Sequence, residues 1–243
     1  MSNYGLGWRP SPFDERDWKP ETLRAMVKLG VVKPMAWETP VWLYQGDKPR
    51  CVGYSGATFW ASAGSKAGIK PDVTNADGDA LYLECKIEDG EPGVENGSTL
   101  RSLANVLKRR GIIDAYSLTN NCTDVKEWVS NYGCAILGIW WYEGMFNPDS
   151  EGFIHPTGSK AGGHAIVKRA REIDRGRLHN TWSKDWGQEG ECWLSDANLQ
   201  MLMNDQGEAL LTVKIEPGIL PAPVTKKKLC HFGRAMRRRE VKK

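Results

Sequence analysis

The hydrophobic pattern changes along the chain, from helical spacing in the first half to strand-like runs in the second. Apolar residues three and four apart predict helices over residues 52–67, 77–87, 98–111 and 123–132. The third is the clearest, because its apolar residues share one face, Ser98 is placed to cap its start and Gly111 to stop it. Thr123 is expected to cap the fourth helix, and a shorter helix is expected near residues 21–29.

The second half carries short runs of β-branched and aromatic residues, which are typical of strands. They predict strands over residues 135–142, 163–173, 177–182, 191–194 and 209–215. A short helix is expected at residues 196–204, between the last two strands. Helices first and strands second predict an α+β chain in two subdomains.

The two ends of the chain differ in composition from its middle. Residues 1–35 make a poor core and are expected to form an extended arm, whereas residues 36–215 are expected to form the domain. Residues 216–243 are expected to be a proline-containing linker and a basic tail; the tail, residues 225–243, carries nine Lys or Arg and one Glu. Two roles for the tail stay open: a solvated terminus, or an arm that docks nucleic acid or an acidic partner.

Composition limits the class of protein. With 243 residues the chain can bury a substantial core, and 40% hydrophobic and 26% charged residues are ordinary for a globular protein. The sequence shows neither an apolar run of the roughly 20 residues needed to cross a bilayer nor a secretory signal. Six cysteines include no Cys-x-x-Cys pair, so neither a zinc site nor any other cofactor is expected.

Candidate chemistry begins at Gln45 and Cys51, which lie six residues apart in a run of turn residues before the first predicted helix. The N-terminus of a helix favours the thiolate over the thiol, which suits Cys51 for nucleophilic attack. A side-chain amide such as that of Gln45 can donate to an oxyanion, as can the backbone N–H of the cysteine.

Two later stretches extend this pattern. His164 follows Gly163 at the start of an apolar run, and Asn180 follows sixteen residues later, within Asn-x-Trp-x-x-x-Trp-Gly-x-x-Gly. In the order Gln, Cys, His, Asn and in these gaps, the chain resembles the papain-like cysteine peptidases. The resemblance implies a two-subdomain fold, with a helical half, an antiparallel barrel-like half of strands, and an active-site cleft between them.

The resemblance also implies roles for individual residues. Cys51 would attack a peptide carbonyl, His164 would hold and return the proton, and Asn180 would orient the imidazole ring. Gln45 would help to hold the oxyanion, and Trp182 would cover the His–Asn hydrogen bond. By the same resemblance Asn96, Gly97 and Gly163 would lie against the substrate backbone.

Departures from the family leave alternatives open. Arg50 precedes the cysteine in place of a small residue, and it could either lower the thiol pKa or obstruct the cleft. Only 113 residues separate Cys51 from His164, fewer than in the papain signature. Taken singly, each candidate could be an ordinary core or turn residue, and His179 could be the base. Whether the N-terminal arm crosses the cleft also stays open.

The functional hypothesis is therefore a cysteine peptidase acting on peptide or protein substrates. Two alternatives remain: an inactive member of the same fold that serves as a structural part of an assembly such as a phage particle, or a hydrolase of peptidoglycan stem peptides. Lys48 stands where secreted members usually carry a disulfide-bonded cysteine. Together with the missing signal, this favours a cytoplasmic or virion-associated location.

Overall fold

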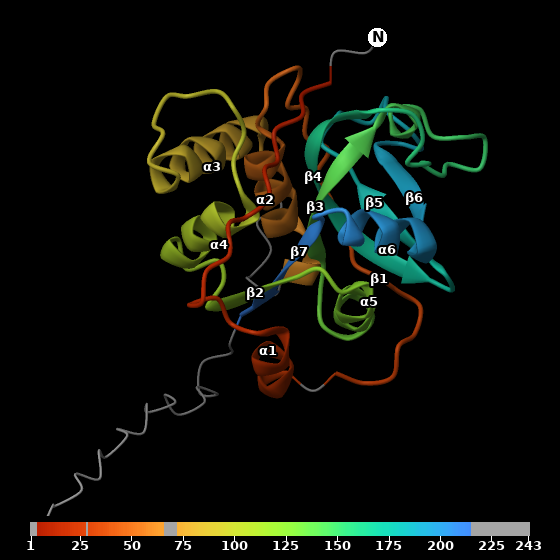
Figure 1. Cartoon of the computed structure of the whole chain (residues 1–243), viewed down its shortest axis with the longest axis horizontal. Helices are drawn as coiled ribbons and strands as arrows, with labels where there is room; N and C mark the ends of the chain where they lie inside the picture. The colour runs from red at the N-terminus through yellow and green to blue at the C-terminus, as the bar shows by residue number, and fades with distance from the viewer. Residues whose placement is uncertain (1–3, 28, 66–71, 215–243) are drawn as a thin grey trace, which may run out of the picture.

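A computed structural model describes residues 4–27, 29–65 and 72–214. The basic tail and the linker before it, residues 216–243, lie outside the described residues, so the docking role of the tail stays a prediction. The described part has six α-helices and seven strands (Figure 1). It confirms the expected α+β class, with helices dominating the first half and antiparallel strands the second.

The helical half consists of α2 (Cys51–Ala61), α3 (Asn75–Glu88) and α4 (Leu100–Arg109). The prediction that the first of these runs to residue 67 was wrong, because the chain turns extended at Ser62, whose hydroxyl donates to the carbonyl of Phe59. Ser98 was also wrong as the cap of α4. Thr99 is the cap, and its hydroxyl accepts from the N–H of Ser102.

Three further helices cover the remaining sheet surface and the lower edge of the molecule. They are α1 (Pro20–Met26), α5 (Cys122–Asn131) and α6 (Asp196–Asn204). The predicted cap of α5 was wrong, since the side chain of Asn121, not that of Thr123, accepts the first free N–H. Short 3₁₀ turns lie at Ala63–Ser65 and Glu143–Met145.

The strands form one antiparallel sheet in the order β2-β7-β3-β4-β5-β6, with β1 paired to β4. Their bounds are β1 Met35–Ala36, β2 Ala115–Thr119, β3 Ala135–Tyr142, β4 Lys160–Glu172, β5 Arg175–His179, β6 Glu191–Ser195 and β7 Glu208–Val213. The sequence analysis did not predict β2, because it is short and Ser117 faces inward among its apolar residues. The strand expected to end at Trp182 ends at His179, since the N–H of Asn180 turns to the carbonyl of Gly190.

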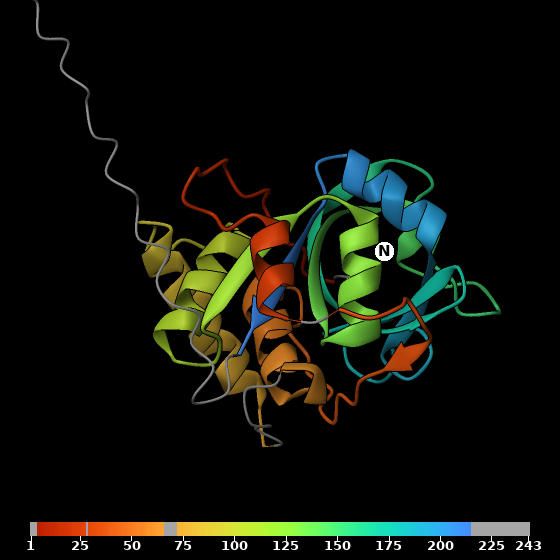
Figure 2. The same ribbon diagram turned by 90° about the horizontal axis from the view of Figure 1, so that it is seen from below.

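The sheet separates two layers of helices. Helices α2 to α4 pack against one face, while α5 and α6 cover the other (Figures 1 and 2). The N-terminal segment, red in Figure 1, descends along the junction between the helical half and the sheet before it reaches α1. The domain is thus built from two halves whose junction runs between α2 and β4.

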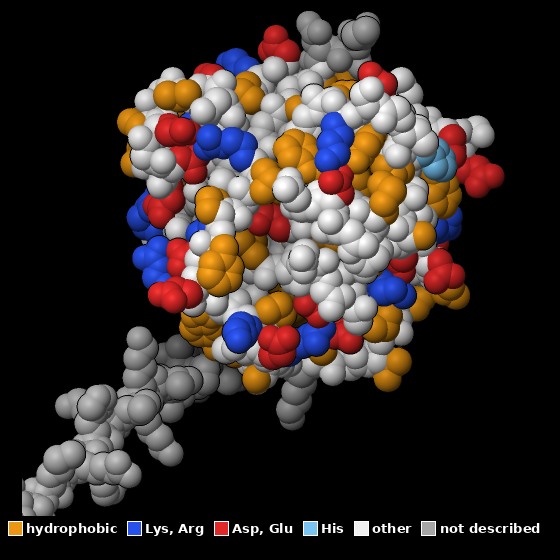
Figure 3. Space-filling view, viewed as in Figure 1, with side chains coloured by type: hydrophobic (Ala, Val, Ile, Leu, Met, Phe, Trp, Pro, Cys, Tyr) orange, Lys and Arg blue, Asp and Glu red, His pale blue; other side chains and the backbone are white. Residues whose placement is uncertain are grey.

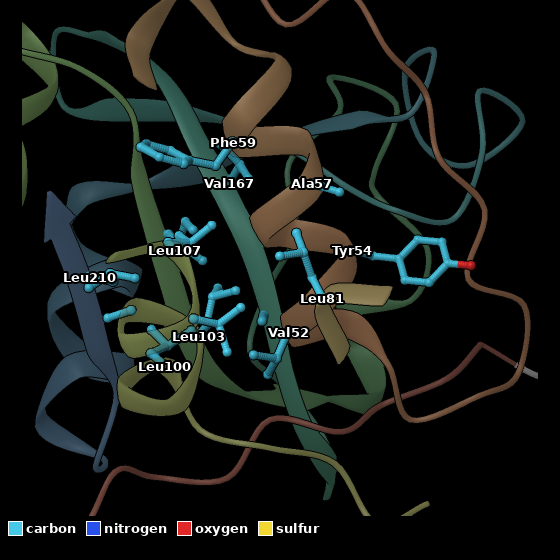
Figure 4. Packing of buried hydrophobic residues seen from close by; sticks show 14 of the residues in the cluster. Val52, Tyr54, Ala57, Phe59, Leu81, Leu100, Leu103, Leu107, Val167 and Leu210 are labelled. Atoms are coloured by element: carbon cyan, nitrogen blue, oxygen red, sulfur yellow. The ribbon is translucent and has the colours of Figure 1, made fainter. Parts of the chain in front are cut away.

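Apolar side chains from both halves meet at this junction (Figure 4). Val52 of α2 packs with Leu100 and Leu103 of α4, while Val167 of β4 and Leu210 of β7 close the core from the sheet. At about 25 cal/mol for each Å² of apolar surface removed from water, burying such side chains supplies most of the driving force for joining the two halves.

On the face shown in Figure 3, acidic and basic side chains are interspersed over α3 and α4. Ion pairs between the two helices account for part of this pattern, among them Arg109 with Glu88 and Arg110 with Glu84. Within the described ranges, no helix is both long enough and apolar enough to cross a membrane.

Leu103→Ala should lower the free energy of unfolding by about 2–5 kcal/mol, because it leaves a cavity where α2, α4 and the sheet meet. Leu83→Ala is the matched control. Leu83 is 46% exposed on α3, and its truncation should cost less than about 1 kcal/mol. Urea unfolding followed by tryptophan fluorescence measures both; equal losses would contradict the description of the core.

Candidate active site

Cys51 is the first residue of α2 and is fully buried. Its thiol accepts a hydrogen bond from the N–H of Ala165 at 3.4 Å, and one turn later the hydroxyl of Ser55 donates to the carbonyl of Ala165 at 2.8 Å. Residues four apart share a helix face, so Cys51 and Ser55 of α2 together bond the N–H and the carbonyl of Ala165 in β4. This pair of bonds places Cys51 beside His164, the residue that precedes Ala165.

His164 points its Nε2 at the Oδ1 of Asn180, 2.8 Å away. Asn180 lies just beyond the end of β5, and its Oδ1 also accepts the N–H of Thr181. Both His164 and Asn180 are buried, and the Nδ1 of His164 has no hydrogen-bond partner among the described residues. Because Asn180 takes Nε2–H, the unpaired Nδ1 is the nitrogen available to the sulfur of Cys51.

Aromatic rings enclose the His164–Asn180 hydrogen bond. The ring of Trp182 lies 4.5 Å from the imidazole centroid, and that of Trp141 meets it edge-on at 4.9 Å. Phe146 and Tyr4 both stack on Trp182, each with its ring about 10° from parallel. Excluding water in this way strengthens a hydrogen bond, because the local dielectric is low.

Gln45 is hydrogen-bonded to Thr181, the residue after Asn180. The backbone N–H of Gln45 donates to the carbonyl of Thr181, and its side-chain Oε1 accepts the Thr181 hydroxyl at 2.6 Å. The Nε2 of Gln45 donates to two carbonyls, that of Lys48 at 2.9 Å and that of Gly5 in the N-terminal segment at 3.1 Å. A peptide carbonyl already lies at the amide that the sequence predicts as an oxyanion donor.

Arg50 and His179 have other partners. The guanidinium of Arg50 forms ion pairs with Asp79 at 2.7 Å and with Glu95, which join the turn before Cys51 to α3 and to the following loop. The Nδ1 of His179 lies 3.0 Å from Glu191 and 3.2 Å from Thr39. The strand β5 ends at His179 and the N–H of Asn180 turns to the carbonyl of Gly190, so the two neighbouring side chains have different surroundings.

The N-terminal segment lies across the site. From here on, the arm means residues 4–11 only, the first described part of the longer N-terminal segment. The N–H groups of Gly7 and Trp8 both donate to the carbonyl of Gly163, at 2.8 and 2.9 Å. On the other side, Ser98 donates its N–H to the carbonyl of Gly7 and accepts the N–H of Arg9. The arm is therefore bonded to both walls of the cleft at once.

The three residues predicted to contact substrate differ in their surroundings. Gly163 bonds the arm directly. Gly97 has a φ of +82° and lies so close to Gly7 that a Cβ would overlap the Gly7 carbonyl. The side chain of Asn96 instead accepts from the buried ammonium of Lys86, which also bonds the carbonyl of Gly97 and so holds this wall in place.

Polar contacts fix the arm along its length. Arg9 pairs with Asp89 and Glu91, at 3.1 and 3.0 Å. The indole N–H of Trp8 and the hydroxyl of Ser11 both donate to Glu208, at 3.0 and 2.8 Å. The Trp8 side chain is buried, so the arm is anchored by packing as well as by hydrogen bonds.

Burial under the arm sets the charge state of the pair. It raises the pKa of the Cys51 thiol to about 11, although the N–H groups of Ala165 and Gly7 oppose the effect. It also lowers the pKa of the His164 imidazole to about 4, partly offset by the hydrogen bond to Asn180. With the arm in place both groups are neutral near pH 7.

Several residues of the site were missed by sequence reasoning. Ser98 was interpreted as a helix cap, and Glu208 was left just outside a predicted strand. The spacing Gly5-x-Gly7-Trp8 was the available signal for the arm, since glycines permit close approach of one backbone to another. The described residues contain no group of three or more His, Cys, Asp or Glu side chains arranged to hold a metal ion.

No family model matches the chain. In sequence, it is 28% identical over 80 residues to the cathepsin B-like cysteine proteinase 6 of Caenorhabditis elegans. That match covers 31% of this chain and 21% of the relative, so it spans about a fifth of the relative's length.

Solved structures resemble the chain over far more of its length. Xylellain, a cysteine protease from Xylella fastidiosa, has a TM-score of 0.63 at 16% identity, over 88% of this chain and 98% of that one. Procathepsin B S9 from Trypanosoma congolense has a TM-score of 0.59 at 15% identity, over 86% and 85%. The Carica candamarcensis cysteine protease CMS1MS2, in complex with E-64, gives 0.54 at 11% identity, over 75% and 100%. At these identities the likeness establishes the fold.

Trp8→Ala should loosen the arm, because it removes the largest apolar contact that holds the arm in the cleft. We expect the amide hydrogens of residues 7–9 and of Ser98 to exchange with solvent at least about tenfold faster, as measured by mass spectrometry. Phe13→Ala is the matched control, since Phe13 is 94% exposed and its loss should leave exchange unchanged. Unchanged protection of Ser98 in Trp8→Ala would show that Trp8 does not hold the arm.

The buried imidazole should make stability depend on pH. The pKa of His164 is about 4 in the folded chain and about 6.5 when unfolded, so the unfolded state binds the extra proton between these values. Stability from this group is therefore present above pH 6.5 and lost as the pH falls toward 4. Burial raises the pKa of Glu208, and this group therefore adds stability as the pH falls. To isolate the contribution of His164, the wild type must be compared with His164→Gln.

Between pH 7 and pH 5 the wild type should lose about 2 kcal/mol more unfolding free energy than His164→Gln. Urea unfolding at each pH measures this difference. A difference that is flat with pH would mean that the imidazole is already solvated or charged in the folded protein.

Proposed function

We propose that this protein, which has the papain-like cysteine protease fold, is a cysteine peptidase that hydrolyses peptide bonds. The observation that carries the proposal is the position of His164, whose Nε2 bonds Asn180 while the next residue, Ala165, bonds the sulfur of Cys51. A nucleophile, a base and a group that orients the base are thus adjacent. This arrangement favours acyl transfer over a purely structural role.

In the proposed reaction, Nδ1 of His164 takes the proton of the Cys51 thiol, and the sulfur attacks the peptide carbonyl. The imidazolium then gives that proton to the leaving amine, which yields an acyl-enzyme. Water, deprotonated by the same imidazole, attacks the acyl carbon and releases the second product and the free thiol. Throughout, Asn180 keeps the ring in one orientation by accepting Nε2–H.

The negative oxygen of each tetrahedral intermediate would be stabilised by the Nε2 of Gln45 and by the N–H of Cys51 at the start of α2. The hydrogen bond from Gln45 to the carbonyl of Gly5 supports this role, because the acceptor is a peptide carbonyl of the arm. Thr181 fixes the amide by bonding its Oε1, so that Nε2 remains the donor.

The arm has to withdraw before a substrate can bind, because its backbone takes the hydrogen bonds of Gly163 and Ser98. The protein as described is therefore a closed form.

The two alternative functions gain no support from the described residues. A structural component of an assembly would not require a buried imidazole oriented by a buried amide next to a residue that bonds a buried thiol. For hydrolysis of peptidoglycan stem peptides, no described feature distinguishes that substrate class from other peptides.

Variants made in the Trp8→Ala chain, in which the arm is expected to be loosened, test the proposed roles of Cys51 and Gln45. In the Trp8→Ala background, Cys51→Ala should abolish hydrolysis of a fluorescent casein substrate, and Gln45→Ala should lower kcat by about 10²–10³, which corresponds to about 3–4 kcal/mol. Gln200→Ala is the matched control, since Gln200 lies on α6 and bonds Asn204. Hydrolysis that survives Cys51→Ala would refute the proposal.

A further inference from the structure

Three basic side chains surround one carboxylate where α5 and α6 pack on β4. The carboxylate is that of Asp196, the first residue of α6, and the nearest cation is Lys126 of α5 at 3.3 Å. Two residues of β4 lie further away, Arg171 at 3.6 Å and Lys168 at 4.0 Å. Direct hydrogen bonds between opposite charges are about 2.7–2.9 Å long, and neither oxygen of Asp196 accepts one from a described residue. Three positive charges thus face one negative charge that does not satisfy their donors.

Lys168 is the innermost member of this group. Its side chain is fully buried, and its ammonium has no hydrogen-bond partner among the described residues. The side chain lies across Gly176 of β5, where a Cβ would fall 1.9 Å from Nζ, so the glycine leaves the space that the ammonium occupies. The Nε of Arg171 is likewise buried without such a partner. Because leaving buried donors unpaired is costly, groups of this kind usually bond a ligand or an ordered water.

Two helices begin beside these donors. Cys122, the first residue of α5, places its thiol 3.9 Å from the carbonyl of Asp196 at the start of α6. The N-terminus of a helix carries a partial positive charge on its free N–H groups and attracts anions. The starts of α5 and α6 therefore add to the positive potential of the basic side chains.

Other carboxylates close in sequence already have partners. Asp124, in the first turn of α5, accepts the hydroxyl of Thr119 at 2.6 Å and pairs with Arg24. Glu172, near the end of β4, pairs with Arg175. Neither of these two carboxylates is free to neutralise the excess positive charge.

We infer that the Lys168 cluster, which comprises Lys126, Lys168, Arg171 and Asp196, binds a small inorganic anion of the size of chloride. The ammonium of Lys168 and the Nε of Arg171 donate to it. The side chains of Asp196 and Arg171 are each only 11% exposed, and Lys126, at 29%, is the most exposed member, which restricts the site to a small ion. Burial lowers the pKa of Lys168 to about 8, and Asp196 opposes the effect, so the ammonium is mostly charged at pH 7.

The bound anion joins α5 and α6 to the strand that carries His164. Lys168 follows His164 by four residues of β4, which places it roughly 13 Å further along the strand. The anion site is thus separate from the cleft, and it holds whether or not the protein is a peptidase. A ligand that binds only the folded chain stabilises that chain as its concentration rises.

Thermal unfolding of the full chain at pH 7 tests the site, with chloride replaced stepwise by gluconate, a larger organic anion. Constant ionic strength keeps the screening of surface charges equal. The wild-type midpoint should rise by at least about 3 °C between no chloride and about 0.2 M chloride, and the rise should saturate. Lys168→Met should abolish the rise. Lys160→Met is the matched control, since it removes an exposed charge at the start of the same strand and should keep the rise.

Asp196→Asn tests the site in the opposite direction and does not depend on the folding of Lys168→Met. Without the carboxylate the anion is no longer repelled, so half of the rise should be reached at a chloride concentration at least about tenfold lower. Equal midpoints of the wild type in chloride and gluconate would mean that the cluster holds only water, and would overturn the inference. So would a chloride response that survives Lys168→Met, or one that is unchanged in Asp196→Asn.

The line width of the chloride NMR resonance measures binding without unfolding the protein. Exchange with a bound, slowly tumbling ion broadens the resonance of free chloride. At equal protein concentrations, the wild type and Lys160→Met should broaden the resonance alike, and Lys168→Met should broaden it at least about threefold less. Equal broadening by all three chains would contradict a site at Lys168.

Discussion

The rest of the site depends on the two hydrogen bonds that join α2 to Ala165 of β4. Cys51 accepts the N–H of Ala165, and Ser55, one turn later, donates to its carbonyl. These two bonds join the helical half to the sheet at the residue after His164. A shift of either half would separate the thiol from the imidazole, so the apolar core between α2, α4 and β4 also maintains the distance between the reacting groups.

The cleft that this junction creates is occupied by the chain itself. The arm satisfies the backbone groups of both walls, bonds the Trp8 indole to Glu208 and sets a peptide carbonyl against Gln45. Burial then keeps Cys51 and His164 neutral, by raising the pKa of one and lowering the pKa of the other. In the proposed function, opening the arm would admit water to both groups, so that access to the cleft and activation of the nucleophile would occur together.

The sequence was most informative where chemistry constrains both residue type and spacing. Gln45, Cys51, His164 and Asn180 stand out because their gaps match a known motif, and the order of helices first and strands second indicated the fold class. Cap positions were less predictable, since Thr99 and Ser98, or Asn121 and Thr123, offer equivalent side chains one or two residues apart. The contacts of Trp8 with Ser98 and Glu208 join residues 90 and 200 positions apart, and no local pattern encodes such pairings.

The most direct test of the account is the pH dependence of Cys51 alkylation in the Trp8→Ala chain, with and without His164→Ala. If His164 holds the proton of Cys51 once the arm has opened, the thiol should react with iodoacetamide at pH 5–6, and His164→Ala should abolish that acid-side reactivity. If Cys51 reacts only near the ordinary thiol pKa of about 8.5 in both chains, the thiol and the imidazole do not form a catalytic pair, and the central claim is contradicted.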